Sequence, residues 1–232
     1  MSAEVCAVHQ PNFFPWLGYF EKISRADRFV IFDDAQFPRT SRGCWSNRVY
    51  LRLNNDKNWL TAPVERDGVK DINETYFKDT SWRESLRGKI SSAYAKASYY
   101  KEHRDFVFAL LDYPENNLAL YNTYVIKEIC TFLGIDTSGI LISSKLDVSG
   151  ESNEKLARLT LASGCSVYMS GDGAEEYLDS DIYEKLGVEL IRQNFVHPVY
   201  EQRGEGFLKG LSIIDWIFNM GAKNPFGNDD EV

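Results

Sequence analysis

The chain contains little cysteine and histidine and no long hydrophobic run. Its four cysteines, Cys6, Cys44, Cys130 and Cys165, are scattered without a CxxC pair. We therefore expect free thiols rather than disulfides or a zinc site. No run of 18 apolar residues occurs, and the first residues carry Glu4 without a basic segment. Neither a membrane span nor a secretory signal is expected, so the predicted location is the cytoplasm.

Basic residues are fewer than acidic ones. The 26 Lys and Arg residues against 34 Asp and Glu give a formal net charge of −8. This balance argues against nucleic-acid binding over the whole surface and leaves only local basic patches. The GxSxG elbow, low-complexity linkers and repeats of fixed period are all missing. The 232 residues, 44% of them hydrophobic, can still bury a sizeable core.

The apolar pattern predicts an α/β protein. An apolar strand at 5–8 precedes a helical pattern from 17 and a second strand at 28–32, which implies parallel strands with a right-handed crossover. Residues 45–64 predict a β-hairpin with its turn at 54–56. The remaining predicted helices cover 81–112, 118–133, 153–161, a short segment from 174, and 211–218, and the remaining strands cover 140–144, 166–170 and 187–191.

These elements predict a mostly parallel sheet with flanking helices, a β-hairpin inserted after the second strand and a helical middle segment. We expect a single domain over residues 1–232. It can be subdivided into an α/β unit with the hairpin at 1–80, a helical segment at 81–138, a second α/β unit at 139–223 and a frayed tail at 224–232.

The first strand-to-helix connection, residues 9–16, is the strongest functional candidate. It follows the carboxyl end of a strand, where ligands bind in open α/β sheets. Two prolines restrict its backbone, so the loop would present His9, Gln10 and Asn12 in a fixed arrangement. Because histidine titrates near neutral pH, His9 is the best general acid–base candidate. The alternative is a rigid turn in which His9 caps a backbone group.

Asp33 and Asp34 follow the second strand, at the same predicted edge. We expect one of them to orient the His9 imidazole; the alternative is that they cap a turn. His197 precedes Pro198, which favours an extended backbone, and is either structural or part of the same pocket. His103 lies among charged residues and is expected at the surface.

Residues 39–66 combine basic and aromatic side chains. Guanidinium groups bind phosphate bidentately and aromatic rings stack on bases or sugars, so a phosphorylated or nucleotide-linked ligand is one interpretation. A solvated hairpin is the other. A weaker anion-site candidate is the segment 170–173, before a short helix, which otherwise forms a plain turn. The residues concerned are Arg39, Arg42, Arg48, Arg52, Lys57 and Arg66, with Trp45, Tyr50 and Trp59.

Short motifs occur in order along nearly the whole chain. They are His9-Gln10-Pro11-Asn12, Pro15-Trp16-Leu17-Gly18, Ala26-Asp27, Asp33-Asp34-Ala35-Gln36, Asn47-Arg48, Trp59-Leu60-Thr61, Pro63-Val64, Leu133-Gly134-Ile135, Ser143-Ser144, Tyr168-Met169-Ser170-Gly171, His197-Pro198-Val199-Tyr200 and Leu211-Ser212-Ile213-Ile214-Asp215. In this order they resemble the WbqC-like family. Its usual setting is bacterial surface-polysaccharide (O-antigen, lipopolysaccharide) gene clusters, with some members beside natural-product pathways.

The resemblance implies a pathway in which amino groups of sugar nucleotides receive acyl or aminoacyl groups. Together with the His9 loop, it predicts an N-acyl or aminoacyl transferase acting on a nucleotide-linked amino sugar. His9 would be the general base, with Asp33 and Asp34 as further catalytic candidates. The expected substrate-binding residues are Gln10, Asn12, Trp16, Gln36, Asn47, Arg48, Ser170, Gly171 and His197.

We expect no bound cofactor and no metal site for this reaction. Coenzyme A or the thioester of a phosphopantetheine carrier is the candidate acyl donor, and an acyl carrier protein is a candidate partner. Two other functions are open. One is a nucleotidyltransferase or ATP-dependent ligase with Mg²⁺ at Asp33 or Asp34. The other is a non-catalytic sugar-nucleotide-binding or scaffold protein.

Overall fold

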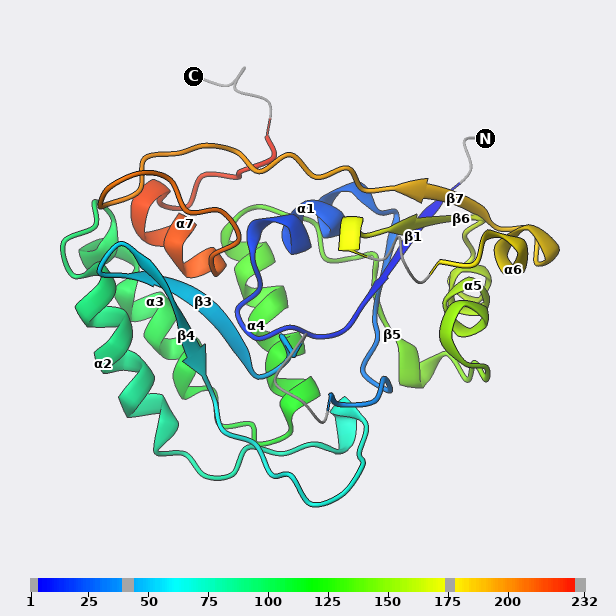
Figure 1. Cartoon of the computed structure of the whole chain (residues 1–232), viewed down its shortest axis with the longest axis horizontal. Coiled ribbons are helices and arrows are strands. Elements are labelled where there is room, and N and C mark those ends of the chain that lie inside the picture. The colour runs from blue at the N-terminus through cyan, green and yellow to red at the C-terminus, as the bar shows by residue number, and fades with distance from the viewer. Residues whose placement is uncertain (1–3, 39–43, 174–177, 228–232) are drawn as a thin grey trace. The chain divides into compact units, whose positions relative to one another are not determined.

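The structure is a computed structural model that describes residues 4–38, 44–173 and 178–227. These residues form two compact units (Figure 1). Within the described ranges, no helix has both the length and the apolar character needed to cross a membrane. Unit 1 takes its residues from Met1–Gln10, Glu21–Ala35 and Asp136–Val196, and unit 2 from Pro11–Phe20, Gln36–Ile135 and His197–Val232.

Unit 1 contains a five-stranded parallel sheet, which confirms the predicted fold class. The order is β5-β2-β1-β6-β7, so the chain starts in the middle, adds strands on one side and then adds strands on the other. This is the strand order of a doubly wound sheet, and the order reverses between β1 and β6. The strands are β1 (Val5–His9), β2 (Arg28–Ile31), β5 (Ile140–Ile142), β6 (Val167–Ser170) and β7 (Glu189–Arg192).

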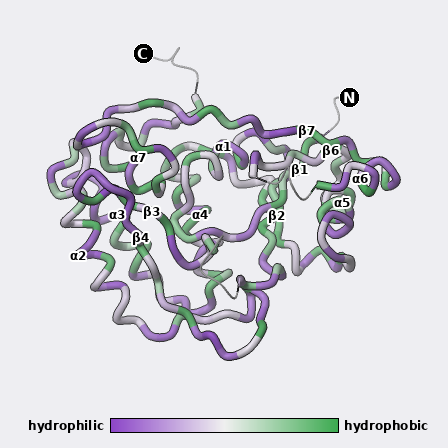
Figure 2. Tube along the Cα trace, viewed as in Figure 1, coloured by the Kyte–Doolittle hydropathy of each residue, from purple (hydrophilic) through white to green (hydrophobic). Residues whose placement is uncertain are grey.

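The central strands β1 and β6 are buried on both faces, whereas the edge strand β7 has exposed charged residues at both ends. Cys6, Ala7 and Val8 of β1 are all nearly inaccessible to solvent. In Figure 2 the hydrophobic stretch of β1 gives way to hydrophilic residues at its carboxyl end. Helices α5 (Ser152–Ala162) and α6 (Ser180–Lys185) contribute to the core on one side, where the rings of Tyr168 and Tyr183 stack with centroids 5.4 Å apart. The start of the helix predicted from residue 174 lies outside the described residues, and α6 begins at Ser180.

Unit 2 contains the predicted hairpin and most of the helices. Strands β3 (Arg48–Leu53) and β4 (Asp56–Thr61) pair antiparallel, and Asn54 and Asn55 have φ values of 53° and 63° in the tight turn between them. Positive φ values at both turn residues give the turn a twist that matches the right-handed twist of the two flanking strands. The helices are α2 (Trp82–Tyr94), α3 (Tyr100–Asp112), α4 (Leu118–Phe132) and α7 (Ile213–Met220), while α1 (Leu17–Arg25) begins in unit 2 and ends in unit 1.

Two expectations for the helical segment need correction. Residues 81–112 form two helices rather than one, because the chain turns between Tyr94 and Tyr100. His103 is not at the surface: it is 8% exposed, and its ring lies 6.0 Å from that of Tyr99 and 5.1 Å from that of Phe132. Helical spacing from Tyr100 and Val107 places His103 on the buried face, and this outweighs its charged neighbours.

Candidate active site at the carboxyl edge of the unit 1 sheet

Polar residues follow every strand of unit 1 at the carboxyl edge of the sheet. The edge is most open to a ligand where the strand order reverses, because the connections from the two neighbouring strands leave in opposite directions. That point lies between β1, which ends at His9, and β6, which ends at Ser170. Two predicted site residues thus lie at the ends of neighbouring strands: His9 is the last residue of β1, and Gly171 directly follows β6. Ser170 is buried, and its hydroxyl donates to the Ile191 carbonyl at 3.2 Å.

The His9 imidazole is partly buried and held in a defined orientation. Its Nδ1 lies 3.2 Å from the Gln10 carbonyl oxygen. Because a carbonyl only accepts, this contact assigns the proton to Nδ1 and leaves the lone pair on Nε2. Burial, followed by the positive charge of Lys22, lowers the pKa of His9 to about 3, while the contact with Gln10 acts in the opposite direction. His9 is therefore neutral at physiological pH.

The hydrogen bonds of Asp33 and Asp34 go to residues that follow β5 or lie on α5, so the orientation of His9 by one of these carboxylates stays a prediction. Asp33 accepts hydrogen bonds from the backbone N–H and hydroxyl of Ser144, at 2.9 and 2.6 Å. Asp34 accepts from the Ser143 hydroxyl at 2.5 Å and pairs with the Lys155 ammonium at 2.7 Å. The reason is strand order: β2 has β5 on its other side, and both carboxylates bond toward the residues after β5.

These bonds also bear on the metal alternative. No group of three His, Cys, Asp or Glu side chains able to hold a metal ion occurs among the described residues. Since the oxygens of Asp33 and Asp34 already accept from serines and from Lys155, Mg²⁺ would have to displace these donors. We derive no reaction step from such a site.

Lys22 is a charged residue of this edge that the sequence interpretation missed. It lies on the part of α1 that belongs to unit 1 and is only 3% exposed. A Cβ built on Gly171 would lie 2.9 Å from the Lys22 Nζ, so the ammonium sits against the backbone just after β6. Burial lowers the pKa of Lys22 to about 8, although the charges of Asp172 and Glu21 raise it. The available signal was the position of Lys22 three residues after Tyr19, on an apolar helix face.

Gln10 follows β1 at the end of a segment of unit 1 and is partly buried. Asn12, Trp16, Gln36, Asn47, Arg48 and His197 belong to unit 2, where some have structural contacts. The Asn47 amide donates to the Ala62 carbonyl at 2.8 Å, and Asn12 is 4% exposed. Gln36 is exposed and forms a backbone bridge with Asp71. Trp16 is partly buried, and its backbone forms a bridge with Ser212.

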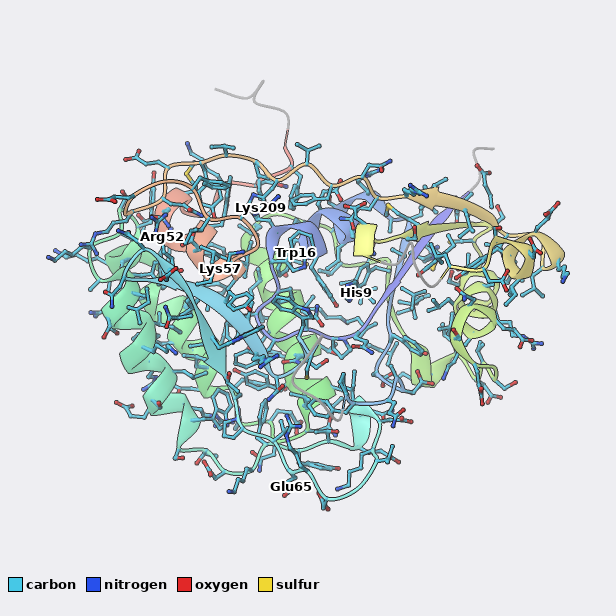
Figure 3. The ribbon with its side chains drawn as sticks, in the orientation of Figure 1. His9, Trp16, Arg52, Lys57, Glu65 and Lys209 are labelled. Atoms are coloured by element: carbon cyan, nitrogen blue, oxygen red, sulfur yellow. The ribbon has the colours of Figure 1, made fainter. Side chains whose placement is uncertain are left out.

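Two of the described basic residues of the hairpin, Arg48 and Arg52, have contacts within unit 2. Arg39 and Arg42 lie outside the described residues. The Arg48 guanidinium lies 3.8 Å from the centre of the Trp59 ring and its Nε donates to the Cys44 carbonyl at 3.2 Å. Arg52 is 4% exposed and donates to Gln202, Asn55 and the carbonyls of 205 and 206. Figure 3 shows Arg52 and Lys57, which are paired residues of β3 and β4.

His197 also lies in unit 2, with its own polar surroundings. Its Nδ1 lies 2.9 Å from the Pro198 carbonyl oxygen, and its ring packs beside Tyr200 and Phe207. Burial lowers the pKa of His197, and the charges of Lys209 and Lys57 act in the same direction.

A second buried polar network in unit 2 was not predicted. Asp215 is fully buried and accepts from the hydroxyls of Tyr94 and Tyr200, at 2.9 and 2.7 Å, and from Gln202 at 2.9 Å. Burial raises the pKa of this carboxyl group. Arg52 and Asp215 line a cavity of about 210 Å³. Because each carboxylate oxygen already has a donor, we interpret this network as structural.

The strand order and the polar carboxyl edge define a doubly wound α/β protein with a candidate ligand site at its switch point. The chain belongs to the WbqC-like protein family, whose model matches residues 10–225. It is 30% identical over 223 residues to an uncharacterized protein, Rv1507c, of Mycobacterium tuberculosis, an alignment covering 94% of this chain and 95% of that protein. No solved structure matches the chain.

Proposed function

We propose that the protein is an N-acyl or aminoacyl transferase that acts on a nucleotide-linked amino sugar in surface-polysaccharide biosynthesis. The observation that supports this most is the neutral His9 imidazole at the switch point of the unit 1 sheet, with Nδ1 engaged and the lone pair on Nε2. The pathway comes from what the family resemblance implies.

The proposed reaction needs one proton acceptor. The sugar amine attacks the carbonyl carbon of an acyl or aminoacyl thioester, a C–N bond forms, and the C–S bond breaks with departure of the thiolate. The proton released from the amine passes to Nε2 of His9 and then to the thiolate, so no external acid or base is consumed. Coenzyme A or a phosphopantetheine carrier supplies the thioester, with an acyl carrier protein as the candidate partner in the second case.

The basicity of His9 depends on its electrostatic surroundings. A base with a pKa of about 3 accepts a proton from an amine poorly, and the nearby Lys22 charge is one cause of that low value. An anionic group bound beside Lys22 would offset this charge and raise the pKa of His9. The phosphates of a sugar nucleotide are such groups, so substrate binding itself would activate the base.

The experiment combines acyl transfer with calorimetry. Wild-type protein is incubated with a panel of nucleotide-linked amino sugars and acetyl-coenzyme A, and the product mass is measured. His9→Asn keeps an N–H donor at the position of Nδ1 but removes Nε2. We expect His9→Asn and His9→Ala to lower turnover about 10²- to 10⁴-fold, while binding of the sugar nucleotide changes little. Lys185→Gln, at an exposed position on α6, is the control.

The outcomes separate the alternatives. Binding without turnover for any donor supports a non-catalytic sugar-nucleotide-binding protein and contradicts the transferase. A joint loss of stability and binding in His9→Asn makes His9 a structural residue of the loop. If no member of the panel binds, the substrate class itself is wrong.

A further inference from the structure

The Lys22 ammonium is a buried charge for which the described residues provide no direct partner. Lys22 is 3% exposed, and no hydrogen bond or ion pair joins its nitrogen to another residue in the described part of the chain. Lysine is almost never so deeply buried unless it is paired, since removal of an ammonium group from water costs several kcal/mol. Among the described residues no acceptor completes the coordination of this ammonium, so the position favours a bound ligand.

The two acidic residues that influence Lys22 are already bonded to other donors. Glu21 accepts from Arg25 at 2.9 Å and from the Gln193 amide at 2.7 Å. Asp172 accepts from the backbone N–H groups of residues 194 and 195, at 2.9 and 3.0 Å. Both carboxylates therefore act on Lys22 only at longer range, and neither completes its coordination.

The position of the ammonium favours a ligand rather than a structural role. Its nitrogen lies against Gly171, directly after β6, and β6 is one of the two strands between which the sheet order reverses. This crevice is where doubly wound sheets bind ligands. Gly171 leaves the space in which the ammonium lies, because any Cβ there would approach Nζ to 2.9 Å.

We propose that Lys22, seated against Gly171, forms an oxyanion subsite that binds a phosphate group of the substrate. The choice of phosphate over carboxylate rests on the proposed function, in which the substrate is a sugar nucleotide. The subsite requires only the charge and position of Lys22, so it can be tested without any acyl donor. It also explains how the occupied site would change His9, since Lys22 is the charge that acts on this imidazole.

The test measures binding of inorganic pyrophosphate and of acetate by calorimetry at pH 7. Lys22→Met should weaken pyrophosphate binding at least tenfold. Lys185→Met, at an exposed position, should change it less than twofold. Gly171→Ala provides a second variant, because its added methyl group displaces only the flexible end of Lys22; it should also weaken binding. Acetate binding comparable to that of pyrophosphate would assign the subsite to a carboxylate and overturn the phosphate assignment.

A second readout is specific to the subsite. In wild-type protein, saturating pyrophosphate should raise the pKa of His9, followed by the NMR shifts of its ring C–H groups; in Lys22→Met, pyrophosphate should leave it unchanged. Undiminished pyrophosphate binding by folded Lys22→Met, or no binding by wild type, overturns the subsite. If Lys22→Met loses pyrophosphate binding and the wild-type protein has no transferase activity, the subsite is retained and the proposed reaction is rejected. If Lys22→Met transfers the acyl group normally with an unchanged KM, the proposed reaction is retained and the subsite is rejected.

Discussion

The neutral state of His9 makes the free energy of unfolding depend on pH in a defined window. In the unfolded chain His9 has a pKa of about 6.5, whereas in the folded protein the pKa is about 3. Between these values the unfolded state binds a proton that the folded state does not, so acidification destabilises the fold. Each pH unit within the window contributes about 1.4 kcal/mol. Between pH 7.5 and 4.5 His9 should therefore remove about 3 kcal/mol of stability.

Urea denaturation of wild type and His9→Asn at pH 7.5 and 4.5 measures this contribution. Wild type should lose about 3 kcal/mol more than the variant on acidification, since other titrating groups are common to both proteins. The ring C–H resonances of His9 should also stay constant between pH 5.5 and 8. Equal acid sensitivity of the two proteins, or a His9 titration centred near 6.5, would refute the argument that His9 is held neutral.

Three further substitutions test the buried charges and hydrogen bonds by urea denaturation at pH 7. Lys22→Met should raise the free energy of unfolding by up to about 3 kcal/mol, because folding lowers the pKa of Lys22 from 10.5 to about 8; a less stable variant contradicts this. Tyr94→Phe removes the hydroxyl that donates to the buried Asp215 at 2.9 Å and should cost about 1–3 kcal/mol; unchanged stability would show that Asp215 does not need this donor. Asp34→Asn weakens the bond from Lys155 at 2.7 Å and should cost about 1.5–3 kcal/mol; a cost near zero would mean that solvent screens the pair.

The sequence predicted which residues of unit 1 form strands better than it predicted which strands lie side by side. The apolar runs of β1, β2 and β6 are recognisable because parallel strands are buried on both faces. The order of strands in the sheet depends on contacts between residues far apart in the sequence. The pairing of β2 with β5 therefore could not be predicted from the sequence. The bonds of Asp33 and Asp34 with Ser143, Ser144 and Lys155 follow from this pairing and were not predicted.

The burial of two residues was misjudged because their sequence neighbours or residue type suggested exposure, while their position on a helix face placed them inside. His103 has charged neighbours in the sequence, yet it is buried because its helix turns that face inward. Lys22 was overlooked because lysine is ordinarily a surface residue, although it shares a helix face with apolar residues. The loop at His9 was identified because its prolines and its place after a strand are local features.

The central position of β1 has a consequence for the order of folding. β1 pairs with β6, with Val5 opposite Val167. The strand β7, which ends at Arg192, pairs in turn with β6. During synthesis β1 therefore lacks one of its two neighbours until β6 has been made. Such distant pairing closes a large loop late, which slows folding and exposes apolar strand edges in the meantime. Chains truncated before residue 167 should thus aggregate, even though they contain the whole His9 loop.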